Sequence, residues 1–506
     1  MAIVVVGFLS LGLAIPAGAT PIASQETGGS DSYHTAADAS KSQTATASPY
    51  PCGSPAIESL PDFRSPTDPD VDCQYEDVNG DRVWNAVDVQ ALFVNQEFVK
   101  EQNDSVQAQF DFNGNGDFTV VDVQALFIQT NTLNPLESNA EQHEINVKGG
   151  SLPFDPALTF ARTQRQLGTN VSPPATIELK NISHLSKVGD SPELFQLLGV
   201  ESGPKRADGP EGTVVAYSTN DKVVLNTDIS STDSELESVL AHEYTHIVHR
   251  NTGDFEALYS EVRNSSGKSL DATTTLQAIS EGGASYEKDA YQRTYQIRPR
   301  TELEIKADQY QQTMGSTKYA YGKYYFGERY VKHLIDTPRR LSSVFQNPPQ
   351  TTEEIIHLLS PGSESPVSLS VNATDSEWNV TGQETNGELF VRAALDAELN
   401  RSQTDRAASG WGNDRRVSFK NGDKRGVAWT LRWDDASDAT EFVRAMTAYL
   451  DRYSEQTNDG WRKNDVQFNL QRAGNRTTVL YAGAPTFVDD TTASTTDGNV
   501  TLDPGT

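Results

Sequence analysis

The sequence predicts a multidomain α+β protein. A duplicated all-α module comes first, a mainly helical domain with a small antiparallel sheet follows, and a small α+β module comes last. The chain has 506 residues, which is more than one small core needs. The heptapeptide VDVQALF occurs at residues 87–93 and again at 121–127. Long helical patterns fill residues 145–360, whereas strand and helix patterns mix in residues 385–485.

Residues 1–24 have the composition of a secretory signal. Residues 2–19 are apolar, and Ala17 and Ala19 have the spacing of a cleavage site, although no Lys or Arg precedes the apolar run. A membrane anchor is the alternative, but the run is short for one. Residues 25–70 contain too few large apolar side chains to offset the entropy of ordering, so we expect a disordered linker there.

Composition limits the partners and the location. The chain has 70 acidic and 41 basic residues and a formal charge of -29, which predicts no nucleic-acid partner and is typical of a halophilic source. With the signal and no second hydrophobic span, we expect a secreted or cell-surface protein without a membrane span in the mature chain. Cys52 and Cys73 either close one disulfide or remain free thiols. The N-x-S/T sequons of an exported chain would accept glycans, and they lie at Asn103, Asn170, Asn181, Asn264, Asn372, Asn379, Asn400, Asn475 and Asn499.

Each repeated heptapeptide follows or overlaps a loop with acidic and amide side chains at alternate positions. A hard cation such as calcium binds about six to eight oxygen atoms, and this spacing wraps the chain around one ion. Two Asx-rich turns without an ion are the alternative. The predicted ligands of the first calcium site are Asp77, Asn79, Asp81, the Val83 carbonyl, Asn85 and Asp88. Those of the second site are Asp111, Asn113, Asn115, Asp117, Thr119 and Asp122.

This arrangement resembles a dockerin, which has two calcium loops that each lead into one helix. The match covers residues 71–133 and includes Asp in place of Glu at the last loop position. In the first loop Arg82 stands where Gly116 provides a sharp turn in the second, so we expect weaker calcium binding at the first site. The resemblance implies a cohesin-like protein partner.

The segment 240-LAHEYTHIVHR-250 contains the candidate catalytic centre, and a capping-box pattern predicts that its helix begins near residue 232. His242 and His246 are one helical turn apart on one face, so both imidazoles can reach one zinc ion. Glu243 falls beside the apolar stripe, where a carboxylate is costly unless it handles a cation or a proton. Beside zinc-bound water it would act as a general base. The alternative is a solvated helix with coincidental histidines.

A later helical stretch, residues 278–291, offers the best third zinc ligand, Glu281. Gly282 and Gly283 would let this helix approach the histidine helix closely, whereas glycine otherwise only weakens a helix. Two further acids on the same stretch compete with Glu281 and are expected to be solvated charges: Glu287 and Asp289.

These residues resemble the gluzincins, thermolysin-like zinc metallopeptidases in which HExxH is joined by a Glu on a later helix. The resemblance implies His242, His246 and Glu281 as zinc ligands and Glu243 as general base. Two features depart from the family pattern. The spacing between His246 and Glu281 is longer than in thermolysin, and Ser285 stands where thermolysin-like sequences have an Asp that orients a histidine.

Three further features accompany the histidine helix. Residues 213–226 alternate and turn near residue 220, which predicts a hairpin. In zincins such an edge strand pairs with an extended peptide substrate. Residues 319–336 form an aromatic helical run in which Tyr321 is the candidate donor to a developing oxyanion, with core packing as the alternative. His249 shares the histidine face but lies too far along the axis to bind the same ion, so we expect an outer or surface residue.

The last part of the chain carries no predicted chemistry. Residues 385–485 combine strand patterns with one amphipathic helix, and we expect Trp411, Trp429 and Trp433 to be buried, with surface binding as the alternative. The Thr-rich residues 486–506 are expected to form a disordered tail.

The sequence as a whole predicts a secreted zinc metallopeptidase that hydrolyses peptide or protein substrates and carries a calcium-binding dockerin-like module for docking or stability. A non-catalytic, calcium-dependent cell-surface interaction protein with a degenerate or structural zinc site is the first alternative. A hydrolase with the same metal centre but a substrate other than peptides is the second.

Overall fold

The structure is a computed structural model. It describes residues 59–132 and 145–505, except 65, 67, 69–72, 81–83, 85, 184, 186–191, 201–213, 229–230 and 296–299. The expected signal at residues 1–24, most of the expected linker, and Cys52 therefore lie outside the described residues. The described residues form two compact units, one within residues 59–132 and one within residues 145–505. Helices and several sheets are both present, so the prediction of a mixed α and β protein is confirmed.

The first unit is helical over its described residues. Its helices are α1 (Ala86–Val94), α2 (Gln96–Lys100), α3 (Asp104–Ala108) and α4 (Val120–Thr132). The repeated heptapeptide lies in α1 and α4, which pack on each other around Leu92, Phe110 and Leu126. Leu60 is only 1% exposed in the same core, so the expectation of a disordered linker up to residue 70 was wrong at its end. Burial of Leu60, with Phe63 packed against the same core, helps to offset the entropy of ordering this segment.

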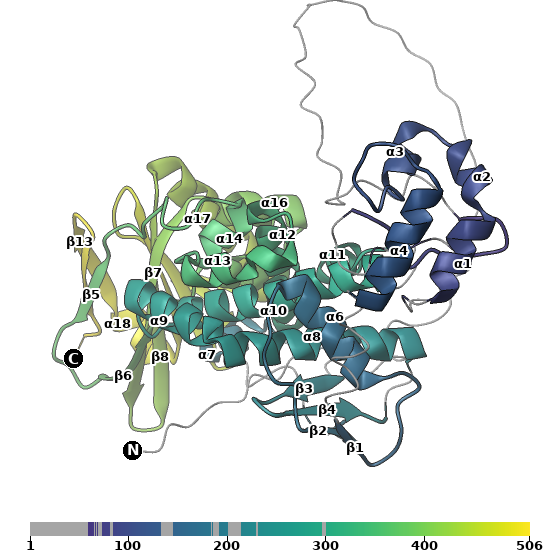
Figure 1. Cartoon of the computed structure of the whole chain (residues 1–506). Helices are drawn as coiled ribbons and strands as arrows, with labels where there is room; N and C mark the ends of the chain where they lie inside the picture. Colours follow the sequence, from purple (N-terminus) through teal and green to yellow (C-terminus); the bar gives the residue numbers. More distant parts are fainter. Residues whose placement is uncertain are drawn as a thin grey trace, which may run out of the picture. The chain divides into compact units, whose positions relative to one another are not determined.

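The second unit holds most of the helices (Figure 1). Two long ones, α8 (Asp233–Thr252) and α10 (Leu270–Tyr295), lie side by side, and α10 also packs along α12 (Gly315–Leu334). The others are α6 (Pro156–Leu167), α7 (Glu193–Leu198), α9 (Asp254–Ser266), α11 (Glu302–Gln312), η1 (Pro338–Arg340), α13 (Leu341–Gln346), α14 (Thr352–His357), α15 (Glu388–Asp396), α16 (Arg401–Ala408), α17 (Ala436–Tyr453) and α18 (Pro485–Asp490).

A four-stranded sheet has the order β1-β2-β4-β3 and contacts α8 through β3. Its strands are β1 (Asn146–Lys148), β2 (Thr176–Lys180), β3 (Ala216–Ser218) and β4 (Lys222–Asn226). The predicted hairpin is confirmed, because β3 and β4 pair antiparallel with Ser218 opposite Val223. The sheet is otherwise parallel, so the prediction of an antiparallel sheet was wrong. Parallel neighbours need a crossover, and α6 provides it between β1 and β2, a connection that strand patterns alone do not reveal.

A seven-stranded antiparallel sheet has the order β6-β7-β8-β12-β11-β10-β9. Its strands are β6 (Asn379–Glu384), β7 (Trp411–Asn421), β8 (Lys424–Trp433), β9 (Glu455–Thr457), β10 (Gly460–Lys463), β11 (Val466–Arg472) and β12 (Thr477–Gly483). Helix α17 packs on β8, β11 and β12. Trp411, Trp429 and Trp433 are at most 1% exposed, which confirms the expectation that they are buried.

The end of the chain is ordered, so the expectation of a disordered tail at residues 486–506 was wrong. Strands β13 (Thr492–Thr496) and β14 (Asn499–Asp503) form a hairpin, and β14 pairs in parallel with β5 (Ser370–Ala373). Val500 and Leu502 are buried in the core beneath. Asp497 and Gly498 have φ values of 51° and 88°, as a two-residue Asp-Gly turn requires, and this dipeptide was the signal in the sequence.

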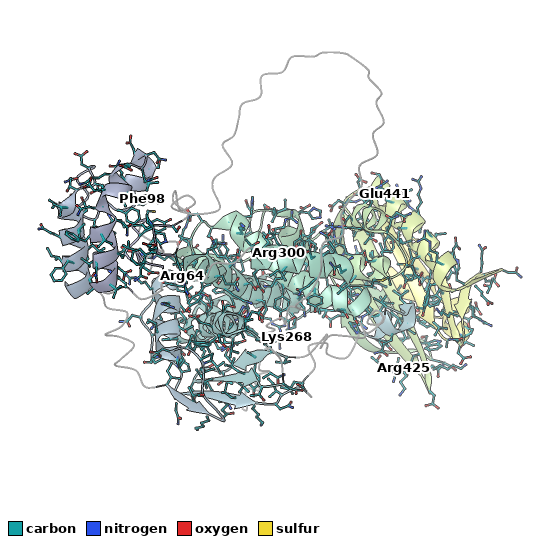
Figure 2. The ribbon with its side chains drawn as sticks, turned by 90° about the vertical axis from the view of Figure 1, so that its right-hand side faces the viewer. Arg64, Phe98, Lys268, Arg300, Arg425 and Glu441 are labelled. Carbon is teal, nitrogen blue, oxygen red and sulfur yellow. The ribbon has the colours of Figure 1, made fainter. Side chains whose placement is uncertain are left out.

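The surface of the second unit carries scattered cations. Lys268 and Arg300 are exposed in loops, and Arg425 is exposed on β8 (Figure 2). Among the helices that the structure describes, none combines the length and the apolar composition that crossing a membrane requires.

Candidate metal centre

The histidine helix, α8, begins where the sequence predicts. Thr232 Oγ1 accepts a hydrogen bond from the Glu235 backbone N–H at 3.2 Å, and the Glu235 carboxylate accepts one from the Thr232 N–H at 2.8 Å. This capping box satisfies two backbone donors that the first helical turn leaves open. Every residue from 237 to 249 is buried, and Glu243 is fully so. The prediction of a solvated helix face therefore does not apply here.

Helices α8 and α10 pair in antiparallel directions. The Tyr291 hydroxyl donates to the Glu237 carboxylate at 2.7 Å, and the Thr245 hydroxyl donates to the Glu287 carboxylate at 2.9 Å. Residues nearer the C-terminal end of α8 therefore contact residues nearer the N-terminal end of α10. Glu281 lies further along α10 in the same direction, and its carboxylate reaches the Nε2 atoms of His242 and His246.

Three buried ligand atoms converge between these helices. The Nε2 atoms of His242 and His246 are 3.2 Å apart. Glu281 Oε2 lies 3.4 Å from the first nitrogen and 3.6 Å from the second. A tetrahedron around zinc with bonds of about 2.0–2.1 Å has edges of roughly 3.3–3.4 Å. The three separations match one triangular face of such a tetrahedron, so this group can hold a metal ion.

The protonation states favour a cation. Burial lowers the pKa of His242 and so favours the neutral imidazole that a metal requires. Burial by itself would raise the pKa of Glu281, but the two histidines outweigh it and hold that pKa well below its usual range. No described residue donates a hydrogen bond to Glu281 Oε2, although this atom is buried. A buried charged carboxylate beside two imidazoles is the arrangement that a bound cation stabilises.

The two glycines after Glu281 have a different role from the expected one. A Cβ atom on Gly282 would lie 2.3 Å from the backbone carbon of Gly327, and one on Gly327 would lie 2.0 Å from the Ala278 oxygen. Gly283 faces the ends of the Phe345 and Leu341 side chains instead. The expectation that both glycines allow contact with α8 was wrong, because Gly282 marks the crossing of α10 with α12.

The acids that compete with Glu281 are not solvated, which corrects the expectation for both. Glu287 is fully buried, and burial raises its pKa well above the usual value. Asp289 is 2% exposed and forms an ion pair with Arg293 at 2.7 Å. Ser285 accepts a hydrogen bond from the Lys306 ammonium, so its hydroxyl is engaged with α11. Helix α10 is buried on nearly all sides, and the sequence pattern of one amphipathic face does not describe it.

His249 and Tyr321 lie outside the three-atom group. His249 is 4% exposed and packs edge-on against Phe345 with ring centroids 4.3 Å apart, and burial lowers its pKa well below the usual value. It is therefore a buried residue and not a surface one. Tyr321 is half-buried on α12 and packs against the main core. Its role as an oxyanion donor stays a prediction.

Two cations near the centre were not singled out from the sequence. Burial lowers the pKa of Lys323, on α12, to about 8, and the Glu281 carboxylate partly opposes this shift. Arg250, on α8, interacts with both Glu243 and Glu281 and donates to Ser218 Oγ and the Thr219 carbonyl at 3.2 Å. Arg250 follows His246 by one helical turn, and Lys323 stands between Tyr321 and Tyr324 in the aromatic run. These sequence positions were the signals that could have identified both cations as neighbours of the metal centre.

The acids at the ends of both calcium-type loops are buried. Asp77, Asp88 and Asp122 are fully buried, and Asp111 is 9% exposed. In the second loop the Asp122 carboxylate accepts from the Asn113 N–H at 3.2 Å, and Asp88 accepts from the Asn79 N–H at the same distance. Gly116 has φ of 92°, as the sharp turn requires. The described loop residues thus keep the repeat symmetry, while Asp81, Val83 and Asn85 lie outside the described residues.

Three other predicted positions in the loops lie on the second repeat. The Asn115 side chain accepts from the Asp117 N–H at 2.9 Å, and the Thr119 N–H donates to the Asp122 carboxylate at 2.7 Å. Cys73, which precedes the first loop, is disulfide-bonded. Cys52 is the only other cysteine of the chain.

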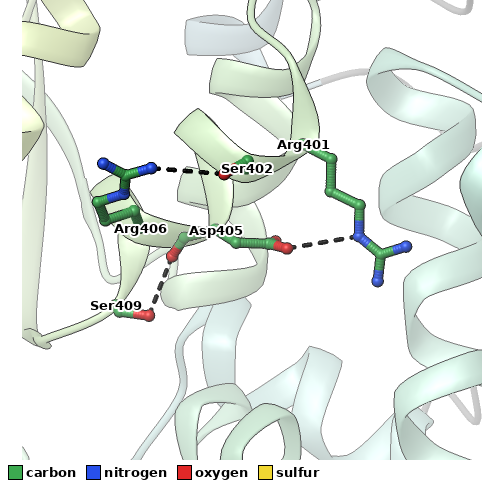
Figure 3. A pocket seen from close by; sticks show the side chains of 5 residues that line it. All are labelled: Arg401, Ser402, Asp405, Arg406 and Ser409. Carbon is green, nitrogen blue, oxygen red and sulfur yellow. Dashed lines mark hydrogen bonds and ion pairs between the residues drawn. The ribbon is translucent and has the colours of Figure 1, made fainter. Parts of the chain in front are cut away.

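A pocket on α16 is separate from the metal centre. It is lined by Arg401, Ser402, Asp405, Arg406 and Ser409 (Figure 3). Arg401 donates to the Asp405 carboxylate and Arg406 donates to Ser402 Oγ, both at 3.4 Å. These polar side chains already form hydrogen bonds with one another along one helix. The pocket therefore has fewer groups available to bind a ligand than the buried group between α8 and α10.

Comparison with known proteins identifies one similarity. Residues 377–492 match a family described as a domain of unknown function (DUF8575), and this range includes all seven strands of the seven-stranded sheet with α15 to α18. Neither the curated proteins nor the solved structures include a match to this chain.

Proposed function

We propose that the protein is a zinc-dependent peptidase whose metal ligands are His242, His246 and Glu281. The observation that carries this proposal is the triangle of buried ligand atoms with sides of 3.2, 3.4 and 3.6 Å. Two histidines and one carboxylate suit a catalytic zinc site, which keeps a fourth position for water or substrate. The residues present therefore fit a zinc ion.

The residues around the triangle fit a hydrolytic reaction. When bound, zinc would polarise the scissile carbonyl and make a water molecule acidic. Glu243 is fully buried next to His242 in the sequence and interacts with it electrostatically, so it is the candidate to take the proton of the water and pass it to the leaving amine. Lys323 and Tyr321 are the candidate donors from α12 to the developing oxyanion.

The β3 strand favours an extended peptide as the substrate. β3 is the last strand in the order of its sheet, and α8 packs against it. An extended peptide can add to such an edge through backbone hydrogen bonds. Arg250 ties Ser218 and Thr219, at the end of β3, to the metal-bearing helix, so substrate binding at this edge would be coupled to the metal centre.

We further propose that the first unit binds calcium at its two loops. Four buried aspartates, two in each loop, support a cation there, because carboxylate oxygens are the ligands that calcium prefers. Docking of a cohesin-like partner rests on the dockerin resemblance. Phe93 and Val94 on α1 and Val121 on α4 are between 49% and 62% exposed, which favours an interaction surface on both repeats.

The replacement of Glu243 by Gln tests the peptidase proposal. We expect the variant to keep about one zinc per chain and to lose turnover of casein by at least about 100-fold, because a general base contributes roughly that much or more. Zinc content is measured by elemental analysis, and cleavage is measured with and without a chelator. Glu261→Gln on the exposed face of α9 is the matched control and should change neither quantity. Wild-type protein without bound metal, or full activity in Glu243→Gln, would contradict the proposal.

The same variant separates the peptidase from a calcium-dependent interaction protein. The exposed side chains on α1 and α4 favour that second candidate function. A binding protein with a structural zinc would cleave nothing, and Glu243→Gln would leave its partner binding unchanged. A wild-type protein that holds zinc but cleaves no peptide would support this reading.

A further inference from the structure

A second group of acids lies away from the α8–α10 centre. Glu353 is in the first turn of α14, Glu364 is in the loop that follows, and Asp434 comes directly after β8. One carboxylate oxygen of each lies within 4.8 Å of the others. Glu353 is 4% exposed, and the other two are half-buried. Three like charges at this separation repel one another strongly unless something neutralises them.

Glu353 has no counter-charge in the part of the chain that the structure describes. No described side chain or backbone group donates a hydrogen bond to its carboxylate, and no Lys, Arg or His nitrogen lies within 4.0 Å of it. The same holds for the carboxylates of Glu364 and Asp434. Arg476 is near Asp434, but its Nε donates to the Trp433 carbonyl at 2.8 Å.

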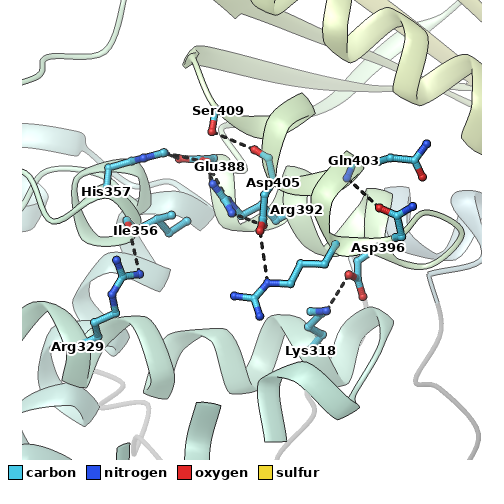
Figure 4. A network of polar contacts seen from close by, with 12 residues as sticks. Lys318, Arg329, Ile356, His357, Glu388, Arg392, Asp396, Gln403, Asp405 and Ser409 are labelled. Atoms are coloured by element: carbon cyan, nitrogen blue, oxygen red, sulfur yellow. Dashed lines mark hydrogen bonds and ion pairs between the residues drawn. The ribbon is translucent and has the colours of Figure 1, made fainter. Parts of the chain in front are cut away.

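The neighbouring Glu388 is a buried acid whose charge is neutralised by cations (Figure 4). Glu388 is fully buried, and it pairs with Arg392 at 2.7 Å and with His357 Nε2 at 3.0 Å. Arg392 in turn pairs with Asp405, and Lys318 pairs with Asp396. The fold therefore supplies cations to Glu388, Asp396 and Asp405, whereas no described Lys, Arg or His nitrogen lies within 4.0 Å of the three-carboxylate group.

The backbone holds the three carboxylates in place. The Glu354 carboxylate accepts from the Glu364 N–H at 3.2 Å, which fixes the loop against α14. Gly412 makes room for Asp434, because a Cβ atom there would lie 2.8 Å from Asp434 Oδ1. The Asp434 N–H donates to the Gly410 carbonyl at 2.9 Å. The convergence is thus built by contacts from α14, its following loop and β7.

We propose that Glu353, Glu364 and Asp434 form a binding site for a hard divalent cation, with calcium as the best fit. Calcium–oxygen bonds of about 2.3–2.6 Å allow ligand oxygens up to roughly 5 Å apart, which covers the observed separations. Carboxylates are preferred ligands of this ion, and the half-buried position of two of them leaves water access to complete the coordination. Burial and the adjacent acids raise the pKa of Glu353 to about 10, so the alternative to a cation is a bound proton.

The position of the site implies a structural role. Asp434 belongs to the region that matches DUF8575, residues 377–492, whereas Glu353 and Glu364 precede it. One ion would therefore fasten the helical part of the second unit to the seven-stranded sheet. This role is independent of the zinc site and of the calcium loops in the first unit.

Calcium binding by the full chain tests the proposal. Bound calcium is counted by equilibrium dialysis for the wild type, for Glu353→Gln and for Asp434→Asn, which lie on different elements. We expect each variant to lose about one calcium per chain relative to the wild type. Glu261→Gln should lose none. Thermal unfolding in chelator should show Glu353→Gln at a higher midpoint than the wild type, because the amide is neutral without binding a cation or a proton. Calcium should reduce or reverse the difference between the two midpoints.

Two results would overturn the proposal. In the first, both variants, shown to be folded by circular dichroism, bind as many calcium ions as the wild type. In the second, calcium, magnesium and manganese all leave the difference between the thermal unfolding midpoints of the wild type and Glu353→Gln unchanged. Only a lower pH then raises the midpoint of the wild type. That outcome would mean that a proton, and not a cation, neutralises the group.

Discussion

The crossing of α10 and α12 gives the sharpest test of the arrangement that presents Glu281. The perturbation is Gly282→Ala, which adds one methyl group where the two helix backbones meet. Its Cβ would lie 2.3 Å from the Gly327 carbon, 2.6 Å from the Gly327 oxygen and 2.7 Å from the Glu328 nitrogen. All three are backbone atoms, so no side chain can rotate away.

The size of the effect follows from these distances. An ordinary Cβ contact begins at 3.4 Å, so α10 and α12 must separate by about 1.1 Å at this point. Overpacking of a rigid core costs about 1–3 kcal/mol or more, and the upper end applies because both partners are backbone. Replacing Gly by Ala inside a helix returns about 1 kcal/mol. We therefore expect a net loss of about 2 kcal/mol in the free energy of unfolding.

Gly283→Ala is the matched control on the same helix. Its Cβ would lie 3.1 Å from Phe345 Cζ and 3.3 Å from Leu341 Cδ2, which are ends of side chains that can shift by a few tenths of an ångström. The helix propensity gain offsets this cost, so we expect stability within about 1 kcal/mol of the wild type. Urea unfolding followed by circular dichroism gives both values, and the zinc content reports the position of Glu281. If Gly282→Ala is as stable as Gly283→Ala, the close crossing of the two helices is wrong.

Two further predictions concern charge in α10. Glu281→Gln should lower zinc affinity by more than the roughly 10–100-fold typical of residues that only support a ligand. Glu287→Gln should retain zinc, because burial raises the pKa of Glu287 and so favours the neutral form that the amide resembles. Elemental analysis after dialysis distinguishes the two variants, and equal zinc losses would contradict the ligand assignment. Burial raises the pKa of Asp271 to about 7 from a model-peptide value near 3.8. The folded state therefore binds more protons than the unfolded state between these values, and stability should fall as the pH rises from about 4 to about 7, by up to about 1.4 kcal/mol per pH unit. Urea midpoints at pH 5 and pH 7.5 should differ less in Asp271→Asn than in the wild type, and an unchanged difference would contradict the assigned shift.

The sequence predicted those features that depend on residues close together along the chain. The capping box at Thr232 and Glu235, the hairpin of β3 and β4 and the helices of the duplicated heptapeptide depend on residues a few positions apart. The same is true of the one-turn spacing of His242 and His246. The ordered tail was missed for a different reason, because the Thr-rich composition outweighed the short Asp-Gly turn signal and the buried positions of Val500 and Leu502.

Features that depend on two distant segments were decided only by the tertiary structure. The sequence determined that two histidines share one face of a helix and that a buried Glu243 stands beside them, because helix geometry fixes the direction of neighbouring side chains. Only packing decided that Gly282 contacts α12, that Glu287 is buried, and that Glu353 and Glu364 meet Asp434. The physical reason is that the burial and the electrostatic environment of a side chain arise from contacts between elements that are distant in the sequence. The spacing of residues along the chain carries no information about those contacts.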